Sequence, residues 1–412
     1  MESGPTAHRT VATPSNDDHI AARESYRSLS VILNERTKIL KSASRVIHLL
    51  PLLLVCPFAF GQDNSAITAK MEQVRDKHHL PALAAIAMID GEVRYLNAIG
   101  VRKLGSPEKV TPDDKWHIGS CTKSMTATLA AMFVEQGKLN WNTTVGDVFS
   151  EWRDEIHPDW RGVTIEQLLQ HRGGAPHDAP RDLWALAWKK IGSPMEQRRE
   201  FVHGLLTRPQ AIPPGTKFEY SNQGYAIAGA MLEHITKEPW EKLIREMLFE
   251  PLEMKSAGFG APATPGKIDQ PWGHTKKNNK PVPPGPKADN PPAIAPAGTV
   301  HCSLTDLAHY ADLHARGQFA DTPLLKHESF LKLHTAPPGQ DYAMGWIVAS
   351  RPWAGGPALT HVGSNTTFLV DIWVAPEKHA ALIAATNTAE DATRAADEMI
   401  GVLVRRFLKQ PE

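Results

Sequence analysis

The sequence lacks an excess of either charge. Its 412 residues include 45 Lys and Arg against 45 Asp and Glu, so the formal net charge is zero. Proteins that bind nucleic acids concentrate basic residues on one face, and this balance leaves no surplus for such a face. Cysteine is also scarce, at three residues, whereas hydrophobic residues make up 42% of the chain. We therefore expect no nucleic-acid partner and a fold that depends on its core and not on disulfides.

The motifs of several enzyme classes are absent as well. Nineteen histidines are present, but no His-Glu-x-x-His or paired-cysteine pattern arranges them as metal ligands. There is no Gly-x-Ser-x-Gly, the nucleophile motif of α/β-hydrolases, and no glycine-rich loop for a dinucleotide or phosphate. We expect neither a metal nor another cofactor.

An apolar run near the N-terminus is short for a membrane span. Residues 46–60 follow a basic flank of Lys38, Lys41 and Arg45, and small residues stand where signal peptidase would cleave, before residue 62. A bilayer span needs about 20 apolar residues. We expect residues 1–61 to be an extension carrying an export signal, so that the protein is periplasmic or secreted. The alternative is an uncleaved anchor at 46–60, which would then be its membrane contact.

The rest of the chain, residues 62–412, reads as strands, then helices, then strands. Residues 82–99 are two β-leaning runs joined by Asp90-Gly91, a strong hairpin signal. Residues 164–250 are mainly helical in pattern, and the Pro- and Gly-rich residues 261–298 predict one long surface excursion.

Strand-like alternation returns at 357–388, and a closing amphipathic helix is expected at 390–408. This order predicts an α+β domain whose sheet joins both ends of the domain. A helical subdomain is inserted between them, at about residues 138–260.

A serine and a lysine at helical spacing carry the first chemical signal. Ser120 and Lys123 open an apolar helix directly after Gly119. A serine hydroxyl needs a base within hydrogen-bond reach, and positions i and i+3 share a helix face. The helix N-terminus favours an oxyanion, and burial lowers the pKa of a lysine toward that of a working base. Ser120 could equally be a plain N-cap with Lys123 in solvent.

The Ser-x-x-Lys pattern is weak alone, because it occurs twice more. Ser106 to Lys109 lies in a polar loop, and Ser329 to Lys332 lies in an ordinary surface helix. Two later triplets strengthen the first occurrence. Tyr220-Ser221-Asn222 precedes a helix, where the Tyr220 phenol can share a proton and the Asn222 amide can orient a substrate.

The second triplet opens a late strand at His361. The imidazole of His361 can bond substrate, and Gly363 lets a ligand approach the backbone. The backbone amide of Ser364 can donate to an oxyanion. His171-Arg172-Gly173 has the same His-x-Gly pattern, but it lies in the helical block, where a structural role is expected.

Taken together, Ser-x-x-Lys, Tyr-x-Asn and His-x-Gly in this order resemble the serine β-lactamase and penicillin-binding-protein superfamily. The resemblance covers about residues 64–412 and is closest to the branch with class C β-lactamases, D-alanyl-D-alanine carboxypeptidases, D-aminopeptidases and esterases. Framework segments of that branch are matched by residues 164–176, 296–308 and 342–346. The resemblance implies an antiparallel sheet flanked by helices, with an inserted helical subdomain.

The resemblance also implies the roles of the site residues. Ser120 is the nucleophile, Lys123 its base partner, and Tyr220 relays protons. Asn222 binds substrate, and the amides of Ser120 and Ser364 form the oxyanion hole. The reaction passes through an acyl-Ser120 ester that water cleaves.

One departure narrows the expected activity. Class C β-lactamases carry Lys-Thr-Gly where this chain has His361-Val362-Gly363, which weakens the positive charge that holds a β-lactam carboxylate. We expect a serine hydrolase of a small molecule or short peptide, cleaving a D-amino-acid peptide, a β-lactam or a small ester. Carboxypeptidase, aminopeptidase or esterase activity is favoured over β-lactamase. The alternative is a penicillin-recognising sensor that binds or acylates without efficient turnover.

Overall fold

The computed structural model describes residues 64–408, apart from positions 211 and 390. The signal or anchor predicted within residues 1–61 lies outside the described residues and stays a prediction. Residues 62–412 cluster as one compact unit. Within the described part of this unit, no helix is both long and apolar enough to cross a membrane.

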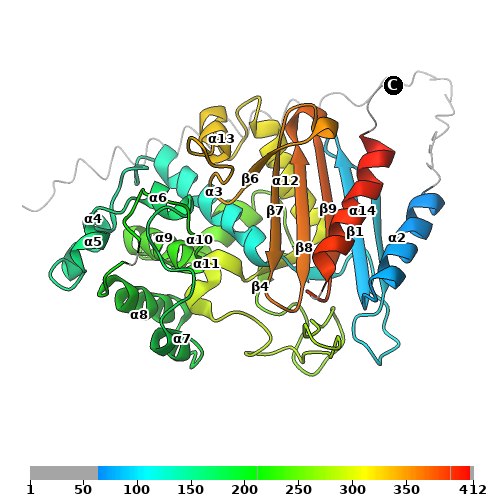
Figure 1. The fold of residues 1–412 in the computed structure, drawn as a ribbon, viewed down its shortest axis with the longest axis horizontal. Coiled ribbons are helices and arrows are strands. Elements are labelled where there is room, and N and C mark those ends of the chain that lie inside the picture. The colour runs from blue at the N-terminus through cyan, green and yellow to red at the C-terminus, as the bar shows by residue number, and fades with distance from the viewer. Residues whose placement is uncertain (1–63, 211, 390, 409–412) are drawn as a thin grey trace, which may run out of the picture. The chain divides into compact units, whose positions relative to one another are not determined.

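A six-stranded antiparallel sheet joins the two ends of this unit, as the sequence predicts. Its strand order is β2-β1-β9-β8-β7-β6 (Figure 1), so that the first hairpin pairs directly with the last strand, with Ile86 opposite Ile383. The strands are β1 Ala82–Ile89, β2 Glu92–Gly100, β6 Ile347–Ser350, β7 Pro357–Ser364, β8 Leu369–Ala375 and β9 Ala380–Thr386.

The predicted hairpin turn is confirmed in detail. Asp90 and Gly91 both have positive φ, 53° and 76°, which is the conformation that a two-residue type I′ turn requires. Strand β1 consists of alanines and larger apolar residues throughout, and nearly all of them are buried. A strand with both faces covered reads as a continuous apolar run, and this explains the absence of alternation in β1.

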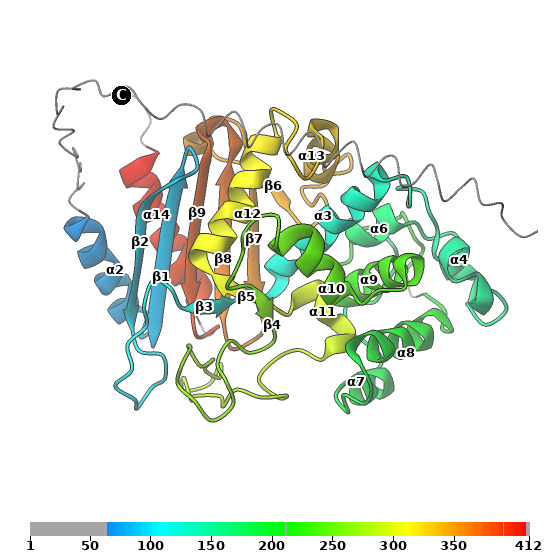
Figure 2. The ribbon, with the colours of Figure 1, turned by 180° about the vertical axis from the view of Figure 1, so that it is seen from behind.

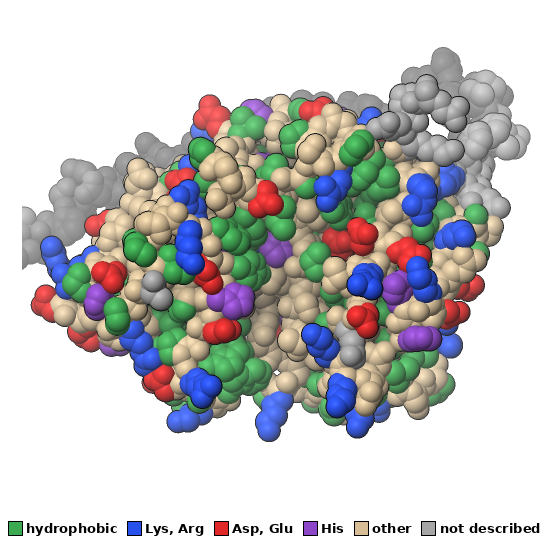
Figure 3. Space-filling view, in the orientation of Figure 1, with side chains coloured by type: hydrophobic (Ala, Val, Ile, Leu, Met, Phe, Trp, Pro, Cys, Tyr) green, Lys and Arg blue, Asp and Glu red, His purple; other side chains and the backbone are tan. Residues whose placement is uncertain are grey.

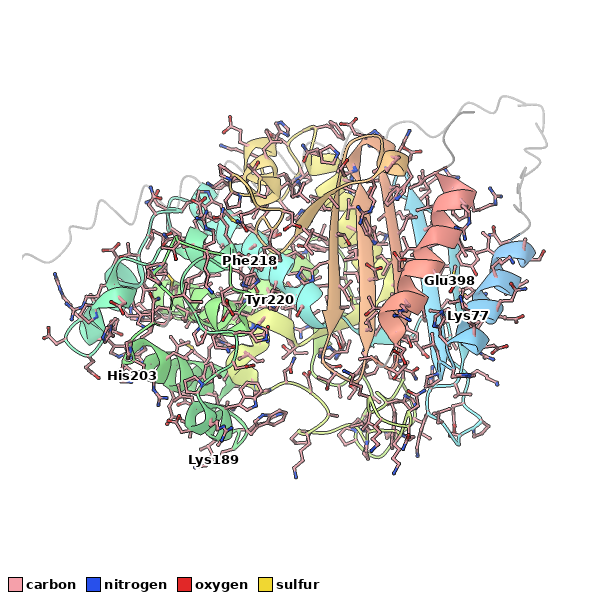
Figure 4. The ribbon with its side chains drawn as sticks, in the orientation of Figure 1. Lys77, Lys189, His203, Phe218, Tyr220 and Glu398 are labelled. Carbon is pink, nitrogen blue, oxygen red and sulfur yellow. The ribbon has the colours of Figure 1, made fainter. Side chains whose placement is uncertain are left out.

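Helices cover both faces of this sheet. Helices α2 (Ser65–Lys77) and α14 (Ala392–Phe407) lie on one face, where Lys77 pairs with Glu398 at 2.8 Å (Figures 1 and 4). Helix α12 (Leu304–Gly317) covers the other face (Figure 2). The closing helix therefore forms where the sequence predicts it.

The remaining helices gather beside the sheet (Figure 1). They are α3 Thr122–Glu135, α4 Val145–Val148, α5 Pro158–Arg161, α6 Ile165–Leu169, α7 Arg181–Ala187, α8 Pro194–Leu206, α9 Asn222–Thr236, α10 Trp240–Ile244, α11 Ala295–Gly298 and α13 His327–His334. The predicted helical block thus forms as a set of short helices around α3 and α9. Helix α3 is buried from Thr122 to Phe133, which makes it the central helix of this half.

A second, three-stranded sheet was not predicted. It consists of β3 (Lys115–His117), β5 (Val300–Ser303) and β4 (Gly258–Phe259), in the order β3-β5-β4. These strands have two to four residues, too few to show a period of two. Their pairing places residues 115–117, which lead into the turn that holds Ser120, beside the segment that follows residue 298.

The segment 261–298 is only partly the surface excursion that the sequence predicts. Its last residues are buried, and they form a short 3₁₀ turn (Pro292–Ile294) followed by α11. The alanines of α11 pack against α3 and α9 because small side chains allow close approach of the backbones. The end of this segment therefore belongs to the core next to Ser120.

Candidate active site

Ser120 lies in a tight turn between β3 and α3, and its side chain is partly exposed. Lys123, one helical turn later, places its Nζ 3.1 Å from the Ser120 Oγ. The preceding Gly119 has φ +49°, and a Cβ there would lie 2.2 Å from the backbone nitrogen of Ser364. A glycine is therefore required for this turn to approach β7 so closely.

Lys123 is fully buried, and its Nζ has three polar neighbours. Besides Ser120, the Nζ donates to the Asn222 Oδ1 at 2.7 Å and to the Ala297 carbonyl at 2.9 Å. Burial disfavours the ammonium form and lowers the pKa of Lys123 to about 7, an effect that the nearby Cys121 partly opposes. The structure thus brings Ser120, Lys123 and Asn222 together.

Tyr220 reaches the same point from the chain segment before α9 (Figure 4). The Lys123 Nζ lies 4.7 Å from the centre of the Tyr220 ring. Burial raises the pKa of the Tyr220 phenol, and a hydrogen bond with Ser120 lowers it in part. Tyr220 is therefore a neutral phenol at physiological pH, with its hydroxyl beside Ser120.

The N-terminal cap of α9 holds Tyr220 and Asn222 in place. The Ser221 Oγ accepts from the Gly224 amide at 3.2 Å and donates to the Pro176 carbonyl at 2.6 Å. The exposed His177 donates from Nδ1 to the Tyr220 carbonyl at 2.9 Å. These bonds fix the Ser221 side chain and the Tyr220 backbone. The Tyr220 and Asn222 side chains therefore stay directed at Lys123.

Strand β7 faces the turn that holds Ser120 through Gly363 and Ser364. A Cβ at Gly363 would lie 2.0 Å from the Ile118 carbonyl, so only glycine fits this contact. The pairing of β6 with β7 ends at Thr360, and residues 361–364 continue past it. The Ser364 Oγ accepts from the Thr366 amide at 2.9 Å, so this side chain is engaged in the turn that follows β7.

His361 is buried on the same strand. Its Nδ1 donates to the Val362 carbonyl at 2.8 Å, so its Nε2 accepts from the Tyr342 hydroxyl at 3.3 Å. Burial and the charge of Lys123 lower the pKa of His361 to about 3, so the imidazole is neutral at physiological pH. Both ring nitrogens are engaged within the protein, and substrate contact by His361 stays a prediction.

These residues meet near the middle of one face of the molecule. Figure 3 shows a hollow there, between the helical half and the sheet, and Tyr220 lies at this place in the matching view of Figure 4. The two other Ser-x-x-Lys pairs are not built like this one. Lys332, for example, pairs with Glu166 at 2.6 Å.

Comparison with known proteins agrees with this arrangement. The sequence model of the family described as Beta-lactamase matches residues 67–404. The chain belongs to the β-lactamase family. Among solved structures, a D-alanine carboxypeptidase AmpC from Burkholderia cenocepacia has a TM-score of 0.65 at 20% identity, over 82% of this chain and 98% of that one. The fold is thus the β-lactamase and transpeptidase-like fold that the motifs predict.

Two curated relatives of this β-lactamase-family protein have diverged far from it. Penicillin-binding protein 4 of Amycolatopsis lactamdurans is 29% identical over 253 residues, 61% of this chain and 64% of that protein. The unguisins hydrolase ungD' of Aspergillus campestris is 25% identical over 359 residues, 82% of this chain and 64% of that protein. The chain therefore spans less than two thirds of the length of these relatives.

His171 has the structural role that the sequence predicts, but sequence reasoning did not predict that it lies beside Tyr220 in this β-lactamase-family site. Its buried ring lies 4.4 Å from the Tyr220 ring and 4.6 Å from the Tyr342 ring, between ring centres. The Ser221 amide donates to its Nδ1 at 3.1 Å. His171 therefore supports the Tyr220 segment from below. The His-x-Gly pattern that made it a competitor of His361 was the available signal.

Proposed function

We propose that this β-lactamase-family protein hydrolyses an amide or ester through an acyl-Ser120 intermediate, with Lys123 as general base. The observation that carries this proposal is the buried Lys123 amine, 3.1 Å from the Ser120 Oγ and with a pKa of about 7. A base is most effective when its pKa lies near the working pH. About half of the molecules then hold Lys123 in the neutral form at pH 7.

The contacts of Lys123 suit a neutral amine. The Ala297 carbonyl and the Asn222 Oδ1 can only accept, so two N–H bonds point to them. In the neutral form the third position is a lone pair, and it faces the Ser120 hydroxyl. Lys123 can then take the Ser120 proton as the Oγ attacks the substrate carbonyl carbon, which forms the tetrahedral intermediate.

The groups around Ser120 suit the later steps. The Tyr220 phenol, protonated and bonded to Ser120, can pass its proton to the leaving amine or alcohol as the carbonyl–heteroatom bond breaks, and the proton that Lys123 took from Ser120 then restores the phenol and the neutral amine. The Ser120 and Ser364 amides are the proposed donors to the oxyanion, since Ser364 packs directly against the Gly119 turn. Water then cleaves the acyl-Ser120 ester, with Lys123 and Tyr220 again moving the protons.

The part of β7 that runs past β6 supports an extended, peptide-like substrate. Residues 361–364 run past the end of β6, and such a strand edge can pair with the backbone of a bound peptide. The neutral His361 adds no positive charge to hold a β-lactam carboxylate. We therefore propose a D-amino-acid peptide or a small ester as substrate. The same proposal includes export of the protein, directed by a signal within residues 1–61.

A substrate panel tests this ranking. The purified protein is given p-nitrophenyl acetate, D-alanine p-nitroanilide and a chromogenic cephalosporin, of which only the cephalosporin carries a carboxylate. We expect kcat/KM for the ester or the D-amino-acid amide to exceed that for the cephalosporin by about tenfold or more, since a lost charge contact costs about 1.5–3 kcal/mol. Faster turnover of the cephalosporin would contradict the ranking. Stoichiometric labelling by a fluorescent penicillin without turnover of any substrate would favour the sensor.

A further inference from the structure

A buried carboxylate, Asp289, lies behind the nucleophile turn. It is 8% exposed and comes from the end of the long segment before α11. Its Oδ1 lies 2.6 Å from the Nε2 of His117 and accepts from the Nδ2 of Asn365 at 3.4 Å. His117 immediately precedes the Ser120 turn, and Asn365 immediately follows Ser364. Asp289 therefore contacts both chain segments that carry the proposed oxyanion donors.

On the Ser120 side, the contact acts through a histidine tautomer. His117 is fully buried, and its Nδ1 accepts a hydrogen bond from the Gly119 amide at 3.1 Å. A neutral imidazole whose Nδ1 accepts carries its proton on Nε2. That N–H does not point straight at the Asp289 oxygen, but the carboxylate 2.6 Å away still favours a proton there. Asp289 thus favours the tautomer that leaves Nδ1 free to hold Gly119.

On the Ser364 side, Asn365 organises the turn after β7. Its Oδ1 accepts from the Thr367 amide at 3.2 Å, the Thr367 hydroxyl at 3.0 Å and the Phe368 amide at 3.0 Å. The Nδ2 of the same side chain is the group that donates to Asp289. Because Asn365 is 5% exposed, these bonds are shielded from water and keep the turn in one arrangement.

We propose that Asp289 is a positioning residue that sets the spacing of the Ser120 and Ser364 amides, acting through His117 and Asn365. This inference rests on the proposed function, because it assigns those two amides to the oxyanion. Loss of one oxyanion donor costs about 10²–10³ in kcat, and misplacement by about 1 Å costs up to about 10². As a positioning residue, Asp289 acts on the two amides and not on the substrate, so its effect is expected in the chemical step.

The same segment also positions the base. The Asn290 Nδ2 donates to the Gly298 carbonyl at 2.7 Å, and the adjacent Ala297 carbonyl accepts from Lys123. One stretch of chain, residues 289–298, therefore contacts the base Lys123 directly. It contacts the segments of the two proposed oxyanion donors through His117 and Asn365. Its buried position near Ser120 is explained by these contacts.

The test measures how fast a fluorophosphonate labels Ser120 in the purified full-length protein, by intact mass and peptide mapping. In labelling, a Ser120 Oγ–P bond forms, the P–F bond breaks, fluoride leaves, and Lys123 takes the proton. We compare the wild type with Asp289→Ala, Asp289→Asn and the control Asp306→Ala. Asp306 is also 8% exposed, and its Oδ2 accepts from the amide and hydroxyl of Ser256 at 2.8 and 2.5 Å.

We expect Asp289→Ala to lower the maximal labelling rate by about 10- to 100-fold with little change in the concentration for half-maximal rate. Asp289→Asn should give an intermediate rate, about 3- to 10-fold below the wild type, since its amide oxygen can still accept from Asn365 but lacks the charge that favours the His117 proton on Nε2. Asp306→Ala should lower the thermal midpoint by a few degrees and leave the rate unchanged.

Two results would overturn the proposal. One is a wild-type labelling rate in Asp289→Ala. The other is an equal slowing in Asp289→Ala and Asp306→Ala that follows their losses in thermal midpoint, because that would indicate general destabilisation. A wild-type protein that is not labelled at Ser120 would instead refute the proposed function, and the inference with it.

Discussion

The Ser120→Ala variant is expected to lose kcat/KM by about 10⁴- to 10⁶-fold for its best substrate. Removal of a serine nucleophile has an effect of this order, because the base and the oxyanion donors act as one unit with it. The Ser120 side chain is partly exposed, so its loss should cost only about 1 kcal/mol of folding free energy. Steady-state kinetics and a thermal melt together check both parts.

The chain offers a matched control for this variant. Ser329 stands in the same Ser-x-x-Lys pattern on α13, but Lys332 pairs with Glu166 instead. Ser329→Ala should therefore hydrolyse substrate at the wild-type rate. If Ser120→Ala kept more than a small percentage of the activity, another residue would have to be the nucleophile.

The second large effect concerns the protonation of Lys123. Its base role requires the neutral amine, and its pKa is about 7. With fewer neutral molecules at lower pH, kcat/KM should rise tenfold per pH unit below about pH 6 and level off above about pH 8. At pH 5 the rate should be about 1% of the plateau value.

Two substitutions of Lys123 distinguish its function as a base from its positive charge. Lys123→Ala removes both, and we expect a loss of about 10³- to 10⁴-fold in kcat/KM at the alkaline plateau, near the upper end for general base catalysis, and a profile that no longer rises through pH 7. Lys123→Arg keeps a cation that does not deprotonate, and should be similarly inactive. Lys332→Ala serves as the control and should keep the wild-type pH profile. A flat profile from pH 5 to 8 in the wild type would exclude Lys123 as the base.

The sequence predicted the elements with strong local signals. Asp90-Gly91 set the first hairpin because both residues tolerate positive φ, and the structure has both there. The closing helix predicted at 390–408 is α14, Ala392–Phe407. Its apolar residues repeat at helical spacing, so that one side of the helix packs against the sheet. The ordered triplets around Ser120, Tyr220 and His361 predicted the family, which the comparisons confirm.

The missing parts of the site had no local signal. The Ala297 carbonyl that accepts from Lys123 is backbone, and no residue type marks it. The segment that carries it was assigned to the surface because its Pro and Gly content is that of a loop, whereas its small residues allow it to pack beside α3. The contact of Asp289 with His117 joins distant positions, and only the pairing of β3 with β5 brings their segments together.

The acyl-enzyme itself is the most direct test of the account. The protein is mixed with a slowly hydrolysed ester or fluorescent penicillin, quenched in acid during turnover, and digested for peptide mass mapping. We predict one acyl group per protein, on the peptide that contains Ser120, and none in Ser120→Ala. Turnover with no adduct, or an adduct on a different serine such as Ser124 or Ser364, would contradict it.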